Sequence, residues 1–223
     1  MNRAVLWDWD GVVIDSSRQH ELSWERLARE LDKALPEGHF KRGFGKKNEV
    51  IIPEILAWAT DPEEVARLGR RKEAIYREIL REPGFEPRAL PGAADLVKAL
   101  QAAGVPSVIA TSTERANVEV ALDVLGLRDA FCGIVSADDV SRGKPDPEVF
   151  LTAADRAGAK PEHCIVLEDS THGIEAGLAG GMAVVAVATT NTEVELADSG
   201  AQRVVHRLTA LSVPALRQLV PDR

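Results

Sequence analysis

Residues 4–16 read Ala4-Val5-Leu6-Trp7-Asp8-Trp9-Asp10-Gly11-Val12-Val13-Ile14-Asp15-Ser16. The apolar start predicts a buried strand that ends in two carboxylates one residue apart. Because side chains alternate along a strand, Asp8 and Asp10 can point to one side while Trp9 points to the other, and Gly11 permits the turn that follows. Two carboxylates this close repel unless a cation or a shared proton lies between them. The pair therefore predicts a divalent-metal site, or a nucleophile beside its acid–base partner; alternatively, the aspartates begin a loop or cap a helix.

The composition is that of a globular protein. The chain has 223 residues, of which 45% are hydrophobic and 28% charged, and its net charge is -8. An acidic chain is not expected to bind a nucleic-acid backbone. Apolar runs stay well below the ~20 residues that span a bilayer, so no membrane partner is expected. The chain enters its first strand almost at once, which leaves no room for a signal peptide and predicts a cytoplasmic location. The composition does not distinguish a monomer from a dimer.

The two cysteines, Cys132 and Cys164, each lie in an apolar run that is typical of a core strand. Neither has a second cysteine at metal-ligand spacing. We therefore expect two buried free thiols.

The rest of the chain divides into a helical part and an alternating part. Apolar residues at three and four spacing predict helices over 16–33, 48–59 and 61–82, although Pro53 suits only a first turn or a kink. From Pro91 on, helices alternate with apolar strands, and this pattern predicts right-handed crossovers and a doubly wound, Rossmann-like α/β core with a parallel sheet. The helical part is too long for a crossover, so we expect an inserted all-helical cap domain at 17–88 in a core of 1–16 and 89–223.

Polar residues follow the predicted strands of the core. In chain order they are Asp8 and Asp10, then Thr111-Ser112-Thr113, Lys144 in a Gly-Lys-Pro-Asp-Pro loop, and Glu168-Asp169-Ser170. Ligands of open α/β sheets bind at the carboxyl ends of the strands, so we expect these groups to meet. Together they match phosphoryl transfer, in which a carboxylate attacks phosphorus while hydroxyl, amide and lysine groups hold the oxygens. Taken one at a time, the hydroxyl and acidic groups could be helix caps and the lysine an ordinary solvated side chain.

The four motifs together resemble the haloacid dehalogenase-like superfamily of aspartate-nucleophile phosphotransferases. They are the DxDGVxxDS start, the second strand ending in hydroxyls, the GKPDP loop and the LEDSxxG segment. The all-helical insert resembles the cap of the branch that contains phosphoglycolate phosphatases and β-phosphoglucomutase. The resemblance spans essentially the whole chain.

The resemblance implies a role for each motif. Asp8 would be the nucleophile that forms an aspartyl-phosphate, and Asp10 would protonate the leaving oxygen and then activate water. Mg²⁺ would be bound by a carboxylate oxygen of Asp8, the main-chain carbonyl of Asp10 and Asp169, with Glu168 bound directly or through a water. Its other ligands would be waters.

Phosphate contacts are implied as well. Thr111 and the amide of Ser112 would hold phosphoryl oxygens, and Lys144 would lie between the phosphate and Asp8. The Lys144-Pro145 bond is a candidate cis peptide, because the family often bends there. Ser16 could contact phosphate or water, or could cap the first cap helix.

In the cap, residues 43–48 resemble the substrate-specificity loop of the family. Lys46 or Arg42 could bind a second anionic group of the substrate, and His20 occupies the place of a hinge acid–base residue of the mutase. Basic residues in such loops are usually solvated, and helix histidines are more often packing residues. Trp7 and Trp9 depart from the usual residues around the first aspartate, so the substrate of a relative is not transferable.

The favoured function is a Mg²⁺-dependent phosphatase that acts on a small phosphorylated metabolite, such as a sugar phosphate or phosphoglycolate. A phosphomutase that keeps its aspartyl-phosphate is the alternative, and a non-catalytic binding protein is a third class. A dehalogenase is disfavoured by Asp10 and Asp169, since that chemistry needs no metal. The motifs handle only the phosphoryl group, so they leave the substrate open.

Overall fold

A six-stranded parallel sheet forms the centre of the core in the computed structural model, which describes residues 3–43 and 46–220. The strand order is β5-β4-β1-β6-β7-β8. Counted along the chain within this sheet, the order is 3-2-1-4-5-6, so the direction of winding reverses beside β1. Such a switch point opens a crevice at the carboxyl ends of the strands. The doubly wound α/β fold expected from the sequence is confirmed.

The strands are short, and the central residues of β1, β4, β6 and β7 are completely buried. Leu6 in β1 pairs with Val108 on one side and Val166 on the other. The strands are β1 (Ala4–Trp7), β4 (Ser107–Ala110), β5 (Gly133–Val135), β6 (Cys164–Glu168), β7 (Ala183–Val187) and β8 (Arg203–Val205). Apolar side chains fill both faces of β1, as expected for a parallel strand that is covered on both sides.

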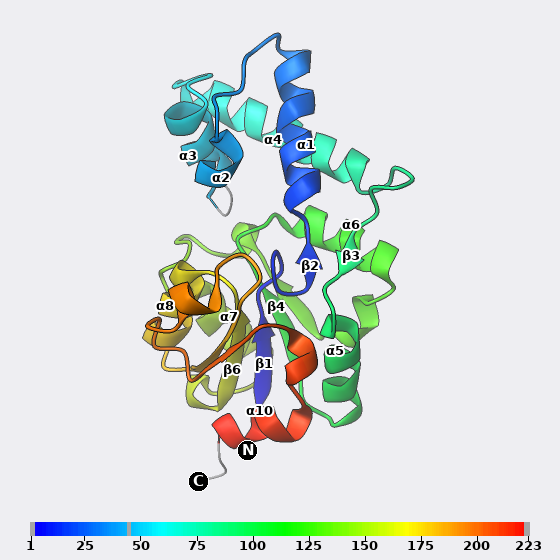
Figure 1. Cartoon of the computed structure of the whole chain (residues 1–223), viewed down its shortest axis with the longest axis vertical. Coiled ribbons are helices and arrows are strands. Elements are labelled where there is room, and N and C mark those ends of the chain that lie inside the picture. Colours follow the sequence, from blue (N-terminus) through cyan, green and yellow to red (C-terminus); the bar gives the residue numbers. More distant parts are fainter. Residues whose placement is uncertain (1–2, 44–45, 221–223) are drawn as a thin grey trace. The chain divides into compact units, whose positions relative to one another are not determined.

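Helices cover both faces of this sheet (Figure 1). Helix α7 packs on β4, β5 and β1 beside α8, whereas α5 packs on β4 and beside α10. The helices of the core are α5 (Ala93–Ala102), α6 (Arg115–Leu125), α7 (Glu148–Arg156), α8 (Thr171–Ala179), α9 (Glu193–Leu196) and α10 (Val213–Leu219). Short 3-10 turns lie at η2 (Arg128–Ala130), η3 (Ala137–Asp139), η4 (Pro161–His163) and η5 (Leu208–Ala210).

A second compact unit, Ser16–Pro87, is inserted into the first, which comprises Met1–Asp15 and Arg88–Arg223. The insert leaves and rejoins the core through a two-stranded antiparallel pair, β2 (Ile14–Asp15) with β3 (Arg88–Ala89). Asp15 lies opposite Arg88 in this pair. The ends of the insert are therefore neighbours.

The insert is all helical in its described residues and has a hydrophobic core of its own. Its elements are α1 (Ser17–Glu30), α2 (His39–Gly43), α3 (Asn48–Val50), the π-helical turn η1 (Ile51–Ile55) and α4 (Pro62–Ile79). Helices α1 and α4 pack together, and Trp24, Leu27, Ile52, Leu68 and Ile75 are buried between the elements. Asp61 caps α4 by accepting a hydrogen bond from the amide of Glu64 at 3.0 Å.

Two expectations differ from the structure. The predicted helix over 48–59 is broken into α3 and the π-helical turn η1, because Pro53 has no amide to donate to a preceding carbonyl. Cys164 is buried as expected, but the prediction for Cys132 is wrong, since this residue is exposed just before the edge strand β5. Among the described residues, a helix of the length and apolarity required for a membrane span is not found.

Candidate active site

Asp8 lies directly after β1, at the switch point of the sheet. Its amide donates to the carbonyl of Leu167 in β6 at 2.9 Å, so the strand pairing continues up to the carboxylate. The chain then turns at Gly11, which has a φ of 85°. The carbonyl of Trp9 accepts hydrogen bonds from the amides of Val12, Val13 and Ile14. This tight turn holds both aspartates at the end of the strand.

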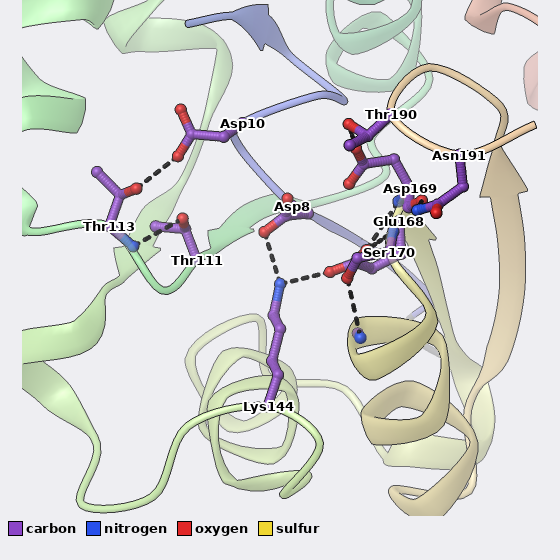
Figure 2. A network of polar contacts seen from close by, with 11 residues as sticks. Asp8, Asp10, Thr111, Thr113, Lys144, Glu168, Asp169, Ser170, Thr190 and Asn191 are labelled. Carbon is purple, nitrogen blue, oxygen red and sulfur yellow. Dashed lines mark hydrogen bonds and ion pairs between the residues drawn. The ribbon is translucent and has the colours of Figure 1, made fainter. Parts of the chain in front are cut away.

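Lys144 lies against Asp8, as the sequence predicts. Its Nζ donates to Asp8 Oδ1 at 2.5 Å and to Glu168 Oε1 at 2.6 Å (Figure 2). The ammonium also lies 4.8 Å from the centroid of the Phe150 ring. The Lys144-Pro145 peptide is cis, which confirms that expectation. Three residues of widely separated sequence position therefore form one buried ion-pair network.

Glu148, the first residue of α7, holds the loop that carries Lys144. The carboxylate of Glu148 accepts hydrogen bonds from the amides of Ser141 at 2.9 Å and Arg142 at 3.0 Å. Asp146 in turn accepts from the amide of Glu148 at 3.0 Å. These contacts fix the backbone on both sides of the lysine.

Glu168 is the last residue of β6, and Asp169 follows it directly. Glu168 Oε2 accepts from the amides of Asp169 and Ser170, both at 2.7 Å, while its other oxygen accepts from Lys144. Ser170 accepts from the amide of Gly173 at 3.1 Å and so caps α8. Helix capping was the alternative role for the whole Glu168-Asp169-Ser170 segment. In the structure only Ser170 of this segment caps the helix.

The site is short of positive charge. Burial raises the pKa of Asp8 to about 7; Lys144 opposes this shift, and Glu168 and Asp10 add to it. Burial likewise raises the pKa of Asp169 well above its usual value, with further contributions from Glu168 and Asp8. For Lys144 burial favours the neutral form, but the carboxylates of Asp8 and Glu168 outweigh it and raise the pKa. In the described part of the chain, the Lys144 ammonium thus bonds to two of the three carboxylates, those of Asp8 and Glu168.

The same three carboxylates could hold a cation. Asp8, Glu168 and Asp169 each offer an oxygen, and these atoms lie within 4.8 Å of one another. A cation would supply the missing positive charge, and an all-oxygen set is the kind that Mg²⁺ prefers. The donor set therefore fits the metal that the sequence implies.

Asp10 faces a different neighbour from Asp8. Its Oδ2 accepts a 2.5 Å hydrogen bond from the hydroxyl of Thr113, in the loop after β4. Thr111 is buried, and its hydroxyl accepts from the amide of Thr113 at 3.1 Å, whereas Ser112 is exposed. Neither threonine caps α6, whose N-cap residue is Glu114. The capping alternative for this hydroxyl cluster is therefore wrong.

One part of the site is absent from the sequence-based expectations. After β7, Thr189, Thr190 and Asn191 contact the turn at Gly11 and both the side chain and the main chain of Asp169. The sequence does carry a signal for this segment, because its hydroxyl and amide side chains follow an apolar strand. Polar residues at the carboxyl ends of the strands are also what located the other groups of the site.

The cap candidates have contacts inside their own unit. His20 stacks on Tyr76 with ring centroids 3.9 Å apart, and its Nδ1 lies 2.8 Å from Lys72 Nζ. Lys72 also pairs with Glu73 at 2.9 Å, and both are buried. This ion pair was not predicted from the sequence. Its signal is the helical spacing, which places Lys72 on the same face of α4 as Leu68 and Ile75.

The other residues singled out in the sequence differ in exposure. Lys46 and Arg42 are exposed, while residues 44 and 45 of the expected specificity loop lie outside the described residues. Ser16 occupies the N-cap position of α1 without a side-chain capping hydrogen bond. Trp9 is fully buried.

The family is shown by comparison with known proteins. Residues 2–181 match the model of the haloacid dehalogenase-like hydrolases. The chain belongs to this family. A haloacid dehalogenase-like hydrolase of family IA from Entamoeba histolytica superimposes with a TM-score of 0.87 at 29% identity, covering 99% of each chain.

Two curated relatives within this family are phosphoryl-transfer enzymes by name. The Arabidopsis thaliana protein named 5-amino-6-(5-phospho-D-ribitylamino)uracil phosphatase, chloroplastic, is 38% identical over 97% of the present chain. The chain spans only 57% of the length of that relative. The β-phosphoglucomutase of Bacillus subtilis is 31% identical, with 83% of each chain covered. The family resemblance inferred from the motifs is thus confirmed.

Proposed function

We propose that this haloacid dehalogenase-like hydrolase is a Mg²⁺-dependent phosphatase of small phosphorylated metabolites. The observation that carries the proposal is the buried network in which Lys144 bridges Asp8 and Glu168, with Asp169 beside them. The Asp8 carboxylate can act as a nucleophile, and the adjacent Lys144 ammonium offsets the negative charge that an anionic substrate brings.

In the proposed reaction, a carboxylate oxygen of Asp8 forms a bond to phosphorus as the ester P–O bond breaks. Asp10 gives its proton to the departing alkoxide. Asp10 then takes a proton from a water whose oxygen attacks the aspartyl-phosphate, which releases inorganic phosphate and restores the Asp8 carboxylate. The hydroxyl of Thr113, which donates to Asp10, orients this acid–base group between the two steps.

The phosphoryl oxygens need donors during both steps. We assign this role to the Thr111 hydroxyl, the Ser112 amide and Lys144, whose ammonium reduces the repulsion between the phosphate and Asp8. A bound Mg²⁺ supplies further charge neutralisation. Asp8, Asp169 and the main-chain carbonyl of Asp10 would hold it, whereas both oxygens of Glu168 already accept hydrogen bonds and make it the partner of Lys144.

The substrate class is supported by the relatives. The Arabidopsis relative is named for a phosphate monoester of a ribityl chain, and the Bacillus relative is named for a sugar phosphate mutase. A small phosphorylated polyol or sugar is therefore proposed. We assign its selection to the cap unit, with His20 and Lys46 as the candidate contacts. The cytoplasmic location stays a prediction, since the Arabidopsis relative is named as chloroplastic.

The mutase is the second candidate, because it would use the same core residues and a relative bears that name. A panel of phosphate monoesters and hexose 1-phosphates separates the two, when both free phosphate and isomerised products are measured. Continuous phosphate release with Mg²⁺ identifies a phosphatase. Isomer formation with almost no phosphate release identifies a mutase.

The covalent mechanism is tested by Asp8→Asn, because an amide does not attack phosphorus. Phosphate release is expected to fall to background, whereas the exposed Asp155→Asn on α7 is expected to keep wild-type turnover. Chelation should stop wild-type turnover and added Mg²⁺ should restore it. Persistent turnover in a folded Asp8→Asn variant would remove the aspartyl-phosphate from the proposal.

A further inference from the structure

The segment after β7 connects two loops of the candidate site. We name residues 189–191 the β7 loop. Thr189 donates its hydroxyl hydrogen bond to the carbonyl of Gly11, next to Asp10. Thr190 donates to Oδ2 of Asp169, and Asn191 donates to the main-chain carbonyl of Asp169 at 2.9 Å. Figure 2 shows Thr190 and Asn191 beside Asp169, on the side away from Thr111 and Thr113.

The space around Asp169 leaves its carboxylate little choice of position. A Cβ built on Gly11 would lie 2.0 Å from Asp169 Oδ2 and 2.8 Å from Thr190 Oγ1. The carboxylate is therefore confined between the backbone of Gly11 and the hydroxyl of Thr190. A carboxylate whose Oδ2 accepts from a fixed hydroxyl keeps Oδ1 for another partner.

The β7 loop is itself anchored on both sides. Before it, the amide of Ala188 donates to Val205 of β8 at 2.8 Å. After it, Thr192 forms a capping box with Glu195 at the start of α9, and Leu196 of α9 is fully buried. The donors to Asp169 and Gly11 are thus carried by a segment that the sheet and a helix hold in place.

We propose that the β7 loop positions the metal site. By binding Asp169 and Gly11 together, it fixes the Asp169 carboxylate relative to the Asp8–Asp10 turn, so that the oxygens proposed to bind Mg²⁺ are arranged before the ion arrives. Thr190, Asn191 and Thr189 are positioning residues, since they act through Asp169 and Gly11. This inference rests on the proposed Mg²⁺ dependence and deepens it.

The test measures Mg²⁺ affinity directly, by titration calorimetry of the resting enzyme without substrate. Thr190→Val keeps the shape of the side chain and removes the hydroxyl donor, so the dissociation constant is expected to rise about 10- to 100-fold, the usual effect of removing a partner that orients a metal ligand. Thr190→Ser restores the donor and should remain within about threefold of wild type. The Mg²⁺ concentration for half-maximal phosphate release should move in parallel.

Thr192→Val is the matched control, because Thr192 is the adjacent threonine and its hydroxyl bonds to Glu195. This variant is expected to lower the melting temperature and leave the Mg²⁺ affinity unchanged. If Thr190→Val does not fold, Asn191→Ala takes its place, with the same expected loss of Mg²⁺ affinity. Wild-type affinity in the folded Thr190→Val or Asn191→Ala variant would overturn the positioning role while leaving the proposed function standing. Absence of Mg²⁺ binding to the wild-type protein would overturn both.

Discussion

At the scale of single residues, the cap unit contains a buried pair of opposite charges, Lys72 and Glu73. Lys72 and Glu73 lie within the cap unit with exposed fractions of only 3% and 6%. Glu73 Oε1 accepts from Lys72 Nζ and from the side-chain amide Nδ2 of Asn48, both at 2.9 Å. Removing a charge from water is costly unless such partners compensate, so this pair is sensitive to the loss of either member.

The Glu73 carboxyl predicts a pH dependence of stability. Burial alone would raise its pKa, but Lys72, His20 and Asn48 outweigh burial and lower the pKa from 4.5 to about 2. A depressed pKa in the folded state gives stability that is present above pH 4.5 and is lost as the pH falls towards 2. Between pH 6 and pH 3 the loss from this one group is about 2 kcal/mol, at about 1.4 kcal/mol for each pH unit below 4.5.

The measurement is urea unfolding of the wild type and Glu73→Gln at a series of pH values. The difference in unfolding free energy between the two proteins should shrink towards acid pH, because Gln does not titrate. Glu63→Gln, an exposed change in the first turn of the same helix, is the control for the loss of an unburied carboxyl. A pH-independent difference between the wild type and Glu73→Gln would show that the pKa of the Glu73 carboxyl is not lowered in the folded protein.

Most site residues that follow strands were predicted from the sequence, whereas those after β7 and the buried ion pair on α4 were not. Asp8, Lys144, Glu168 and Asp169 meet because β1, β6 and the loop before α7 are brought to one edge of the sheet. Lys72 was missed because a lysine within a helix is ordinarily solvated, and only its register among buried residues indicates otherwise. Which oxygen each donor reaches depends on rotamers, which a sequence pattern does not contain.

At the scale of the elements, the start of α8 shows why a glycine follows the acidic segment. A Cβ on Gly173 would lie 1.7 Å from Glu168 Oε1, the atom that accepts from Lys144. The glycine thus makes room for the carboxylate over the first turn of the helix. In an unobstructed helix the same glycine would be a weakness relative to alanine, by about 1 kcal/mol.

Gly173→Ala is therefore expected to act through Glu168. The new methyl group displaces the carboxylate, Lys144 loses one of its two partners, and phosphate release should fall by at least about tenfold, with about 1–3 kcal/mol lost from the unfolding free energy through overpacking. Gly180→Ala at the end of the same helix is the matched control, because its Cβ would meet nothing closer than 3.4 Å and its φ is -76°. Steady-state kinetics and thermal unfolding of both variants decide the matter. Equal activity of the two would show that Glu168 moves aside without consequence.

Elements with a strong period were predicted with bounds close to those observed, and short elements were not. The spacing predicts a helix over 61–82 and the structure has Pro62–Ile79. In contrast, β2 and β3 have two residues each, and β8 has three, whose exposure falls steadily along the strand. Strands of two or three residues are too short for the alternation of apolar and polar side chains to be recognised in the sequence. Their position is decided by pairing with distant segments of the chain.

At the scale of the whole molecule, the chain consists of two units with separate hydrophobic cores. One cluster of buried residues belongs to the sheet and its helices, and another belongs to the cap helices. The insert is joined to the core through β2 and β3, where Asp15 and Arg88 are cross-strand neighbours. Cross-strand neighbours in an antiparallel pair have Cα atoms about 5 Å apart, a distance that a two-residue turn closes.

Excision of the insert is therefore expected to leave a folded core. Replacing residues 16–87 by Asn-Gly joins Asp15 to Arg88 through a tight hairpin turn, and it removes none of the residues proposed to carry out phosphoryl transfer. The shortened chain should unfold cooperatively, bind Mg²⁺, and release phosphate from a small generic ester such as p-nitrophenyl phosphate. Its rates across a panel of larger monoesters should lie closer together than those of the full chain, since a cap that selects the substrate is gone.

The control is a shortened chain that also carries Asp8→Asn. It should release no phosphate, so any phosphate released in its presence comes from a contaminating enzyme. Thermal unfolding comes first in the experiment. A shortened chain without a cooperative transition would show that the core depends on the cap for its stability, in spite of its own buried cluster. A folded shortened chain that discriminates among esters as sharply as the full protein would place substrate selection in the core, and would remove His20 and Lys46 from the list of substrate contacts.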